Sequence, residues 1–551
     1  MSFTTRYRAS IAADLDPLGL KRIGIRSPVH TKTVKEKVES QNTSRTSRES
    51  FNNAPSTPSI PDEGSAEMPS TWAVMKRHRV AVLWSAFVAI AAINWGMDAL
   101  MSTSTISIAA FERDFGYEFE GSYIISSRWQ IGFNSASYIG QFFGAIISGN
   151  MADRLGKRLT LGMACVLSIA AVFVQVFARS SVVLLIGKLL NGITLGTFLT
   201  IPSGYAAEVC PVEIRGLTTS GVQLLISVGQ LAANLVIKGT GTLDSALAYR
   251  IPFALQFVFP VILLIGLPFC PESPWFLLRR SDTDGTVATL TRLGYLCPVT
   301  VLAEMSSIIT HESKHASTTS YLDCFRGSNR RRTEIAMGVF AAAQATGVVF
   351  TLGYSSYFFE LAGLSNSNAF TLSIGVTILG LFGVVCSWFL INRRGRRSTS
   401  LVGVALLTFL TLLIGILDIL PNYSSKGPVY GQVTCIIVFA FVYLCTIGPM
   451  GWALFAEIPS SALRSRTVGL GVVVQSLFGI LLNIVVPLLI NPDAANLRGK
   501  IGFIFAGTSA LGTLWIWLRV PETAGRSFEE LDWLFDQDIP ARRFKGFVIP
   551  S

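Results

Sequence analysis

The sequence is short of charged residues, of histidine and of paired cysteines. Only 14% of its 551 residues are charged, whereas a soluble protein carries roughly 25%. This shortage excludes a protein whose whole surface faces water. The four histidines and eight cysteines show no metal-ligand or disulfide spacing, so we expect no metal, no cofactor and no disulfide framework. No long apolar run precedes residue 80, so no signal peptide is expected.

Long apolar runs are what the chain has in abundance. Half of its residues are hydrophobic, and the mean hydropathy is +0.50. Windows of about 20 apolar residues, the length that crosses a bilayer, recur twelve times. The pattern therefore predicts an all-α integral membrane protein with spans at about 80–101, 129–150, 159–178, 182–206, 218–238, 251–270, 335–360, 368–391, 398–420, 430–456, 467–490 and 500–519.

The spacing of the spans divides the chain into five segments. Residues 1–79 are rich in Ser, Thr, Pro and charge, so we expect a disordered cytoplasmic tail. A first six-helix bundle follows at 80–270 and a second at 335–519. Between them lies a polar cytoplasmic loop, 271–334, and a cytoplasmic tail covers 520–551.

Lysines and arginines gather in alternate loops and set the orientation. They mark the N-terminal tail, the loop after the second span, the central loop and the C-terminal tail, so both termini are predicted to be cytoplasmic in a multi-pass protein of the cell membrane. The net charge of +11 is explained this way, without nucleic acid. Asn422 begins a glycosylation sequon in a predicted outer loop, whereas the Asn42 sequon lies in the tail and should stay unmodified.

Two charged motifs occur twice, once in each half. Gly149–Arg158 follows the second span and Asn392–Arg397 follows the eighth; Glu208 precedes Arg215 by the same spacing as Glu457 precedes Arg464. Two halves on one plan indicate a duplicated membrane transporter. The residues that we interpret as a cytoplasmic gate are Gly149, Asp153, Arg154, Gly156, Arg158, Glu208, Arg215, Arg393, Arg396, Glu457 and Arg464.

The acidic and basic members of these motifs suit a latch. We expect Glu208 to pair with Arg215, and Glu457 with Arg464, and so to hold the cytoplasmic mouth closed. Gly156 permits a tight turn. The competing interpretation is that the charges only anchor loops among lipid headgroups.

Taken together, these motifs resemble the sugar porter branch of the major facilitator superfamily over residues 80–535. The resemblance includes Pro271–Leu277 after the sixth span and Pro521–Arg526 after the twelfth. The stretch Gly353–Glu360 is most similar to fungal α-glucoside (maltose-permease-like) transporters. The resemblance implies the major facilitator fold, with twelve transmembrane helices in two six-helix pseudo-repeats. It also implies a monomer in membrane lipid that binds a small molecule, with protons as an optional partner, and no enzyme activity.

Polar residues inside spans are the candidates for substrate contact, because an unpaired polar group is costly in hydrocarbon. By the resemblance, the sugar-contacting positions are Gln223, Gln230, Gln344, Trp452 and Gln475. Amides offer donors and acceptors to hydroxyl groups, and an indole lies well against the C–H face of a sugar. The competing interpretation is hydrogen bonding between helices.

Asp98 and Lys188 form the plainly intramembrane ionisable pair, and no histidine lies in a span. The resemblance implies a role in proton coupling. A carboxylate beside a cation stays ionised, and moving the cation away lets it take a proton. The competing interpretation is a structural ion pair. Where related proton symporters carry further acids, this chain has Trp95 and Gln141.

The leading functional prediction is a secondary active or facilitative transporter of a sugar, an α-glucoside or a similar polyhydroxy compound, working by alternating access. Transport would be driven by proton symport through Asp98 if it is active, and by the substrate gradient alone if it is facilitative. The alternative is a transporter of another small organic molecule, a weak acid or a specialised metabolite, on the same fold.

The predicted orientation is tested by epitope tags at the two termini. Both tags should be protected from antibody in intact cells and become accessible after permeabilisation, since the positive loops keep both ends inside. An N-terminal tag that stains on intact cells would contradict the orientation.

Overall fold

The computed structural model describes residues 71–119, 122–241, 243–313, 320–355, 358–359, 366–419, 426–490, 495, 497–526 and 528–547. Thr71–Ile549 form one unit, to which all of these residues belong. The predicted glycosylation site Asn422 lies outside the described residues, as does the N-terminal segment 1–70.

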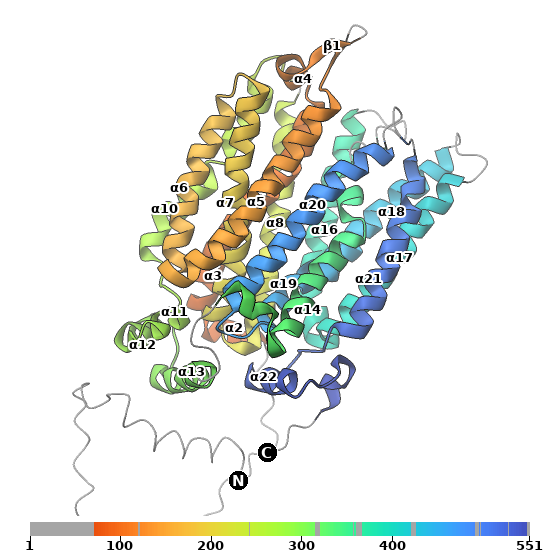
Figure 1. Cartoon of the computed structure of the whole chain (residues 1–551). Helices are drawn as coiled ribbons and strands as arrows, with labels where there is room; N and C mark the ends of the chain where they lie inside the picture. The colour runs from red at the N-terminus through yellow and green to blue at the C-terminus, as the bar shows by residue number, and fades with distance from the viewer. Residues whose placement is uncertain are drawn as a thin grey trace, which may run out of the picture. The chain divides into compact units, whose positions relative to one another are not determined.

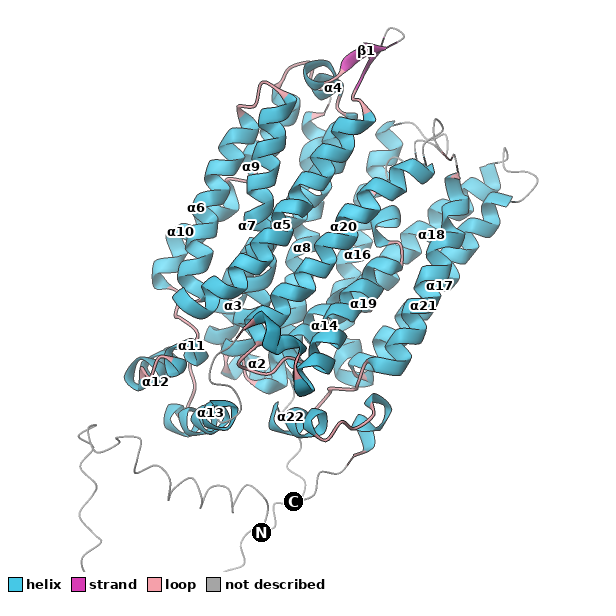
Figure 2. Ribbon diagram, viewed as in Figure 1, coloured by secondary structure: helices cyan, strands magenta, loops and turns pink. Residues whose placement is uncertain are grey.

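Helices dominate the first part of the chain (Figures 1 and 2). A two-stranded antiparallel hairpin, in which Tyr117 pairs with Ile124, stands between α4 and α5. The elements are α2 (Thr71–Arg77), α3 (Arg79–Ser104), η3 (Thr105–Ser107), α4 (Ala109–Phe115), β1 (Tyr117–Phe119), β2 (Ser122–Ile124), α5 (Ser127–Leu155), α6 (Lys157–Val176), α7 (Ser181–Val209), α8 (Val212–Thr240), α9 (Leu247–Leu255), α10 (Val258–Gly266) and η4 (Leu267–Phe269).

The second part begins with short helices and returns to long ones. Its elements are α11 (Pro274–Arg279), α12 (Thr283–Arg292), α13 (Pro298–Ser313), η5 (Tyr321–Phe325), α14 (Gly327–Ala345), the π-helical turn η6 (Val349–Gly353), α16 (Asn366–Arg394), α17 (Arg396–Ile419), α18 (Lys426–Cys445), α19 (Ile447–Glu457), α20 (Arg464–Ile490), η7 (Arg498–Lys500), α21 (Ile501–Arg519), α22 (Phe528–Asp536) and η8 (Ala541–Gly546).

Ten helical segments of the described residues are long and apolar enough to cross a membrane. They include two composite spans, Leu247–Phe269 and Gly427–Phe455. The remaining two expected spans correspond to α5 and to α14 with η6. These helices pack among the other ten segments but carry more polar residues. The predicted all-α membrane fold is confirmed.

Helix α5 tolerates its polar residues because it packs against protein on two faces, α7 on one and α20 on another. Glycines make the first contact very close. A Cβ on Gly144 would lie 2.0 Å from the carbonyl oxygen of Ile193, and one on Gly140 would lie 2.2 Å from that of Leu189. Small residues at such contacts let two backbones approach and pack by van der Waals contact.

The seventh span begins earlier than its apolar window predicted. Helix α14 starts at Gly327, ahead of the expected 335, and its first turns carry three arginines. Arg332 pairs with Asp532, and Arg331 pairs with Asp538 at 3.1 Å, both beyond α21 in the chain. Those acids make a charged helical turn stable, which a hydrophobicity window does not detect.

We call α3 to α10 the N-terminal half and α14 to α21 the C-terminal half. The helices of each half contact one another, and the halves meet along α5 with α20, and along α8 with α16 and α19. The tenth span is broken at Thr446, with Pro449 in the first turn of α19, where its missing N–H costs nothing. This break turns α19 and its Trp452 toward α8. The assignment of each half to a separate six-helix bundle stays a prediction.

Candidate functional site

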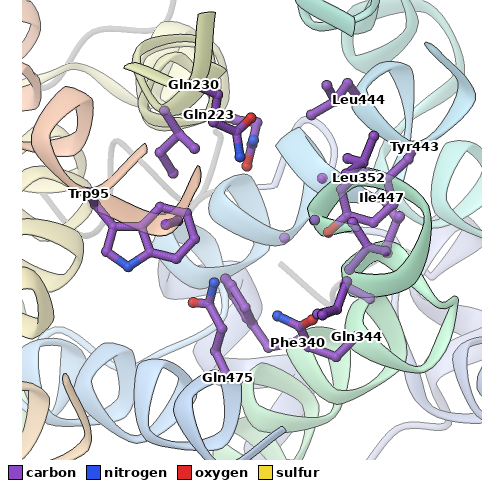
Figure 3. A pocket seen from close by; sticks show the side chains of 18 of the residues that line it. Trp95, Gln223, Gln230, Phe340, Gln344, Leu352, Tyr443, Leu444, Ile447 and Gln475 are labelled. Carbon is purple, nitrogen blue, oxygen red and sulfur yellow. The ribbon is translucent and has the colours of Figure 1, made fainter. Parts of the chain in front are cut away.

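A cavity of about 120 Å³ lies where the two halves meet. Its wall includes all five residues predicted to contact substrate, Gln223, Gln230, Gln344, Trp452 and Gln475. In Figure 3, Gln223 and Gln230 project from one helix, Gln475 and Gln344 face them from below, and Trp95 closes one side. The structure thus brings together side chains that are more than 250 residues apart in sequence.

One hydrogen bond crosses the cavity wall between the halves. The indole Nε1 of Trp452 on α19 donates to Oε1 of Gln223 on α8 at 3.0 Å. Trp452 is 2% exposed, and Phe340 meets its ring edge-on at 5.2 Å between centroids. The indole is therefore fixed at both its polar and its apolar end.

Two amides offer free acceptors to the cavity. Oε1 of Gln344 and Oε1 of Gln475 are buried and accept no hydrogen bond from any described residue. A buried polar atom without a partner is costly, so both oxygens are suited to accept hydroxyl donors from a ligand. No carboxylate, ammonium, guanidinium or imidazole lines this cavity among the residues that the structure describes.

The predicted pair of Asp98 and Lys188 is buried, with both side chains 1% exposed, but the two make no direct ion pair. Asp98 Oδ1 accepts from Asn191 Nδ2 at 3.1 Å and from Gln256 Nε2 at 3.4 Å. Lys188 Nζ donates to Ser102 Oγ at 2.8 Å, one turn along α3 from Asp98. Lys188 therefore acts on the carboxylate through space, while its ammonium bonds a hydroxyl on the helix that carries Asp98.

Sequence reasoning missed the two amides that hold Asp98. Asn191 lies three residues after Lys188 on α7, one helical turn away, so a helical spacing could have indicated it. Gln256 lies at the break between α9 and α10, and no local pattern pointed to it.

At the end of the N-terminal half that is predicted to face the cytoplasm, Glu208 binds a different base from the one expected. Lys157 Nζ lies 2.6 Å from Glu208 Oε2, and Ser273 Oγ donates to the same oxygen. Glu208 and Lys157 are 8% and 4% exposed. The expected partner Arg215 is buried on α8 and does not form this ion pair.

The C-terminal half repeats the arrangement. Arg396 NH2 lies 2.7 Å from Glu457 Oε1, and Thr523 Oγ1 donates to Glu457 Oε2. The expected partner Arg464 is again buried and takes no part in this pair. Both halves thus pair the acid with the base that directly follows the glycine of the repeated motif, Gly156 or Gly395.

A second carboxylate fixes each of these glycine turns. Glu272 accepts from the backbone N–H groups of Lys157 and Arg158, at 3.0 and 3.1 Å, and so caps the start of α6. Burial raises the pKa of Glu272, and these N–H donors work against that shift by favouring the charged form. Gly156 has φ +88°, a conformation that L side chains rarely adopt.

Glu522 takes the same place in the C-terminal half, accepting from the N–H groups of Arg396 and Arg397 at 2.7 and 3.1 Å. Neither Glu272 nor Glu522 was among the predicted gate residues. Both follow a proline in the motifs Pro271–Leu277 and Pro521–Arg526, so their matched positions in the two halves were the available signal.

Other contacts tie the halves to each other at this end. Asp153 on α5 pairs with Arg466 on α20 at 3.3 Å. Tyr321 donates to the carbonyl oxygen of Ile146 at 2.7 Å, and the guanidinium of Arg466 lies 5.8 Å from the centre of its ring. A Cβ on Gly149 would lie 2.5 Å from the Tyr321 hydroxyl, so a side chain there would displace this hydroxyl.

The remaining predicted gate residues occupy the same region with different exposure. The carbonyl oxygen of Arg154 accepts from Arg280, and Arg158 NH1 donates to the carbonyl oxygen of Cys270 at 3.5 Å. Arg393 is exposed at the end of α16. That these residues open and close the transporter stays a prediction.

Hydrogen bonds between α8 and α16 link the halves away from the glycine turns. Asn234 Nδ2 on α8 donates to Thr377 Oγ1 on α16 at 3.0 Å, and Lys238 Nζ donates to Thr371 Oγ1 at 3.0 Å. The halves are therefore joined by an ion pair between α5 and α20 and by hydrogen bonds between α8 and α16.

The chain is similar to known transporters over most of its length. A family model described as "Sugar (and other) transporter" matches residues 84–535. The general α-glucoside permease of Saccharomyces cerevisiae is 34% identical over 480 residues, which cover 85% of this chain and 77% of that protein. A maltose permease of the same yeast is 32% identical over 497 residues, covering 88% and 80%.

Solved structures show the same fold. The proton:xylose symporter XylE bound to 6-bromo-6-deoxy-D-glucose superposes with a TM-score of 0.71 at 20% identity, covering 84% of this chain and 100% of that one. The inward-open conformation of XylE from E. coli gives a TM-score of 0.61 at 20% identity, covering 82% and 98%.

The ion pair between the halves gives a prediction for the gate. Asp153→Asn and Arg466→Gln should each shift the protein toward a cytoplasm-open state by about tenfold, because a charge-assisted bond of the closed state is lost. The double variant should shift it no further, since both changes remove one bond. Pulsed electron spin resonance between labels at the exposed positions Arg158 and Arg394 measures the separation of the halves.

The matched control is Arg543→Gln, which removes the same charge from an exposed side chain outside the predicted gate. We expect its distance distribution to equal that of the wild type. Equal distributions in the wild type, the two single variants and the double variant would show that the Asp153–Arg466 pair is not part of the gate.

Proposed function

The chain belongs to the sugar transporter family of the major facilitator superfamily, and we propose that it carries a neutral sugar or α-glucoside across the membrane by alternating access. The predicted family and fold are confirmed, and the chain is a transporter rather than an enzyme. The observation that carries the substrate proposal is the cavity between the halves, walled by four glutamines and two tryptophans and by no charged side chain among the described residues.

The lining of the cavity supports a polyhydroxy compound. Its amides can donate to and accept from hydroxyl groups, and Trp452 and Trp95 offer flat faces for ring C–H groups. The relatives named for α-glucosides and maltose agree with this chemistry. The predicted contacts Gln223, Gln230, Gln344, Trp452 and Gln475 are the residues that we assign to the substrate.

The same lining weighs against an ionised weak acid, which was the alternative substrate. Burying a carboxylate costs a great deal unless a cation or several donors meet it, and the described wall of this cavity supplies neutral amide, indole and hydroxyl donors without a cation. A neutral specialised metabolite stays compatible with the wall, and a substrate panel separates it from a sugar.

Energy coupling is assigned to Asp98. Asp98 is a buried carboxylate beside the cavity, and Lys188 on α7 bonds Ser102, which lies one turn from Asp98 on α3. Taking up a proton would remove the buried negative charge, and losing it again on the other side of the membrane would complete the cycle. The solved relative XylE is a proton:xylose symporter, which is consistent with this assignment.

The remaining proposals concern the membrane location, oligomeric state and orientation of the protein. We place the protein in the cell membrane as a monomer with both termini in the cytoplasm, on the strength of its alternating positive loops. In this orientation the ionic contacts of Asp153, Glu208 and Glu457 face the cytoplasm. Glycosylation at Asn422 would mark the opposite side.

The substrate site is tested by Trp452→Phe and Gln223→Ala. Each change removes one end of the bond between Trp452 and Gln223, so each should weaken the binding of a transported sugar by about tenfold with unchanged surface expression. The measurement is uptake of maltose, methyl α-glucoside, glucose and xylose in a transporter-deficient cell.

The matched control for this test is Gln175→Ala, which removes a buried glutamine whose side chain bonds the Gly187 carbonyl outside the cavity. It should leave affinity near the wild-type value. Full affinity in both cavity variants would move the substrate site elsewhere, and uptake of none of the four sugars would contradict the proposed substrate class.

The coupling assignment is tested by Asp98→Asn, which mimics a permanently protonated carboxyl. The variant should lose accumulation of sugar against a gradient while keeping sugar exchange, because a neutral site can still alternate. Concentrative uptake and counterflow exchange are measured at several external pH values. Accumulation driven by a pH gradient in the variant would show that Asp98 is not the carrier, and a wild type that never accumulates sugar would show a passive facilitator.

A further inference from the structure

A second, much smaller pocket lies between Asp98 and the substrate cavity. It has a volume of about 20 Å³. Its wall includes Asp98, Asn134, Ser137 and Gln141, and we call this pocket the Asp98 chamber. Trp95 and Tyr138 line both the chamber and the substrate cavity, so these two rings form the partition between them.

Three polar atoms in the chamber wall have no protein partner. They are Oδ1 of Asn134, Oγ of Ser137 and Nε2 of Gln141, and no described residue bonds to any of them. All three side chains belong to α5 and are 5%, 6% and 1% exposed. Buried groups of this kind are normally satisfied by protein or by ordered water, so three in one small pocket indicate a ligand.

The Asp98 carboxylate completes this set. Both hydrogen bonds that it accepts from described residues, those of Asn191 and Gln256, go to Oδ1. Its second oxygen, Oδ2, accepts none from the described part of the chain. The chamber therefore combines one neutral donor, one neutral acceptor, one hydroxyl and one carboxylate oxygen.

The size and chemistry of the chamber select its occupant. A buried water needs roughly 10–15 Å³ and two to four polar partners, so the chamber holds one or two waters. A sugar ring does not fit in this volume, and an apolar ligand would leave all three polar atoms unsatisfied. The titratable groups that act on Asp98 here are Lys188 from α7 and Tyr138 from α5, whereas α9 and α20 contribute the neutral Gln256 and Asn483.

We propose that the Asp98 chamber binds ordered water and that this water carries protons between Asp98 and the substrate cavity. The inference rests on the proposed role of Asp98 in coupling. A proton leaves the Asp98 carboxyl for a chamber water, that water passes one of its own protons to water in the substrate cavity, and the carboxylate remains. The return step reverses each transfer, so no atom or charge is left over.

A hydrogen bond between two uncharged side chains, Trp95 and Gln141, lies on the side of the chamber that faces the substrate cavity. Trp95 Nε1 donates to Oε1 of Gln141 at 2.8 Å, which leaves Nε2 as the amide atom without a partner among the described residues. Neither side chain takes up a proton. The only proton acceptor of ordinary acidity in the chamber wall, among described residues, is therefore Asp98, and water must serve as the intermediate.

The experiment compares Ser137→Val with Ser135→Val in purified protein reconstituted into liposomes. Ser135 is the matched control: it lies on the same helix, is also 6% exposed and also lacks a partner, but does not line the chamber. Sugar-driven proton uptake is followed with an internal pH dye, using maltose or whichever sugar of the panel the wild type carries. Ser137→Val should slow proton uptake by about tenfold, the effect of one lost hydrogen bond, with sugar affinity and counterflow exchange unchanged.

Cryo-EM density at a resolution that shows ordered water gives a second measurement that needs no substrate. Water should appear within hydrogen-bond distance of Ser137 Oγ and Asn134 Oδ1 in the wild type and in Ser135→Val, and be reduced in Ser137→Val. Absence of water from the wild-type chamber would overturn the site. Equal proton uptake in the two valine variants would overturn the relay. A wild type that has water in the chamber but moves sugar without protons would overturn the relay as well. This last result would also refute the coupling part of the proposed function.

Discussion

One end of this transporter, the end that carries the two glycine turns, depends on two buried carboxylates, Glu208 and Glu457. Each is bound by the base that follows a glycine turn, Lys157 or Arg396, and by a hydroxyl. Removing one partner of such a pair would leave a buried charge uncompensated, at a cost of about 3–5 kcal/mol. The pairs therefore fix the ends of the helices within each half.

The neutral lining of the central cavity and the charged side chain of Asp98 occupy separate pockets in the middle of the bundle. The cavity between the halves is lined by amides, indoles, phenols and apolar side chains, while Asp98 lines the smaller chamber beyond Trp95 and Tyr138. A neutral cavity does not bind a proton in place of the substrate. In the proposed mechanism, the charge on Asp98 changes without altering the groups assigned to the sugar, so helix α3 and the chamber water link the two events.

The apolar windows predicted the helical fold well, because bilayer thickness sets the length of a span whatever its partners. They failed at Gly327, where Asp532 and Asp538 from the end of the chain stabilise a charged turn. The cavity glutamines were also indicated by sequence, since polar residues in apolar helices are rare. The partners of Glu208 and of Asp98 were not, because Lys157, Asn191 and Gln256 become neighbours only when separate helices pack.

The contacts between the halves are weaker than those within them, and this difference permits movement. Within the N-terminal half, Gly144 touches the backbone of Ile193 and a buried ion pair holds α6 to α7. Between the halves, α8 and α16 are joined by bonds such as Asn234 to Thr377, a neutral bond worth about 0.5–1.5 kcal/mol. Helices α5 and α20 are joined by the partly exposed Asp153–Arg466 pair. A ligand that binds one arrangement of the halves more tightly by a few kcal/mol can therefore exchange these contacts without loosening either half.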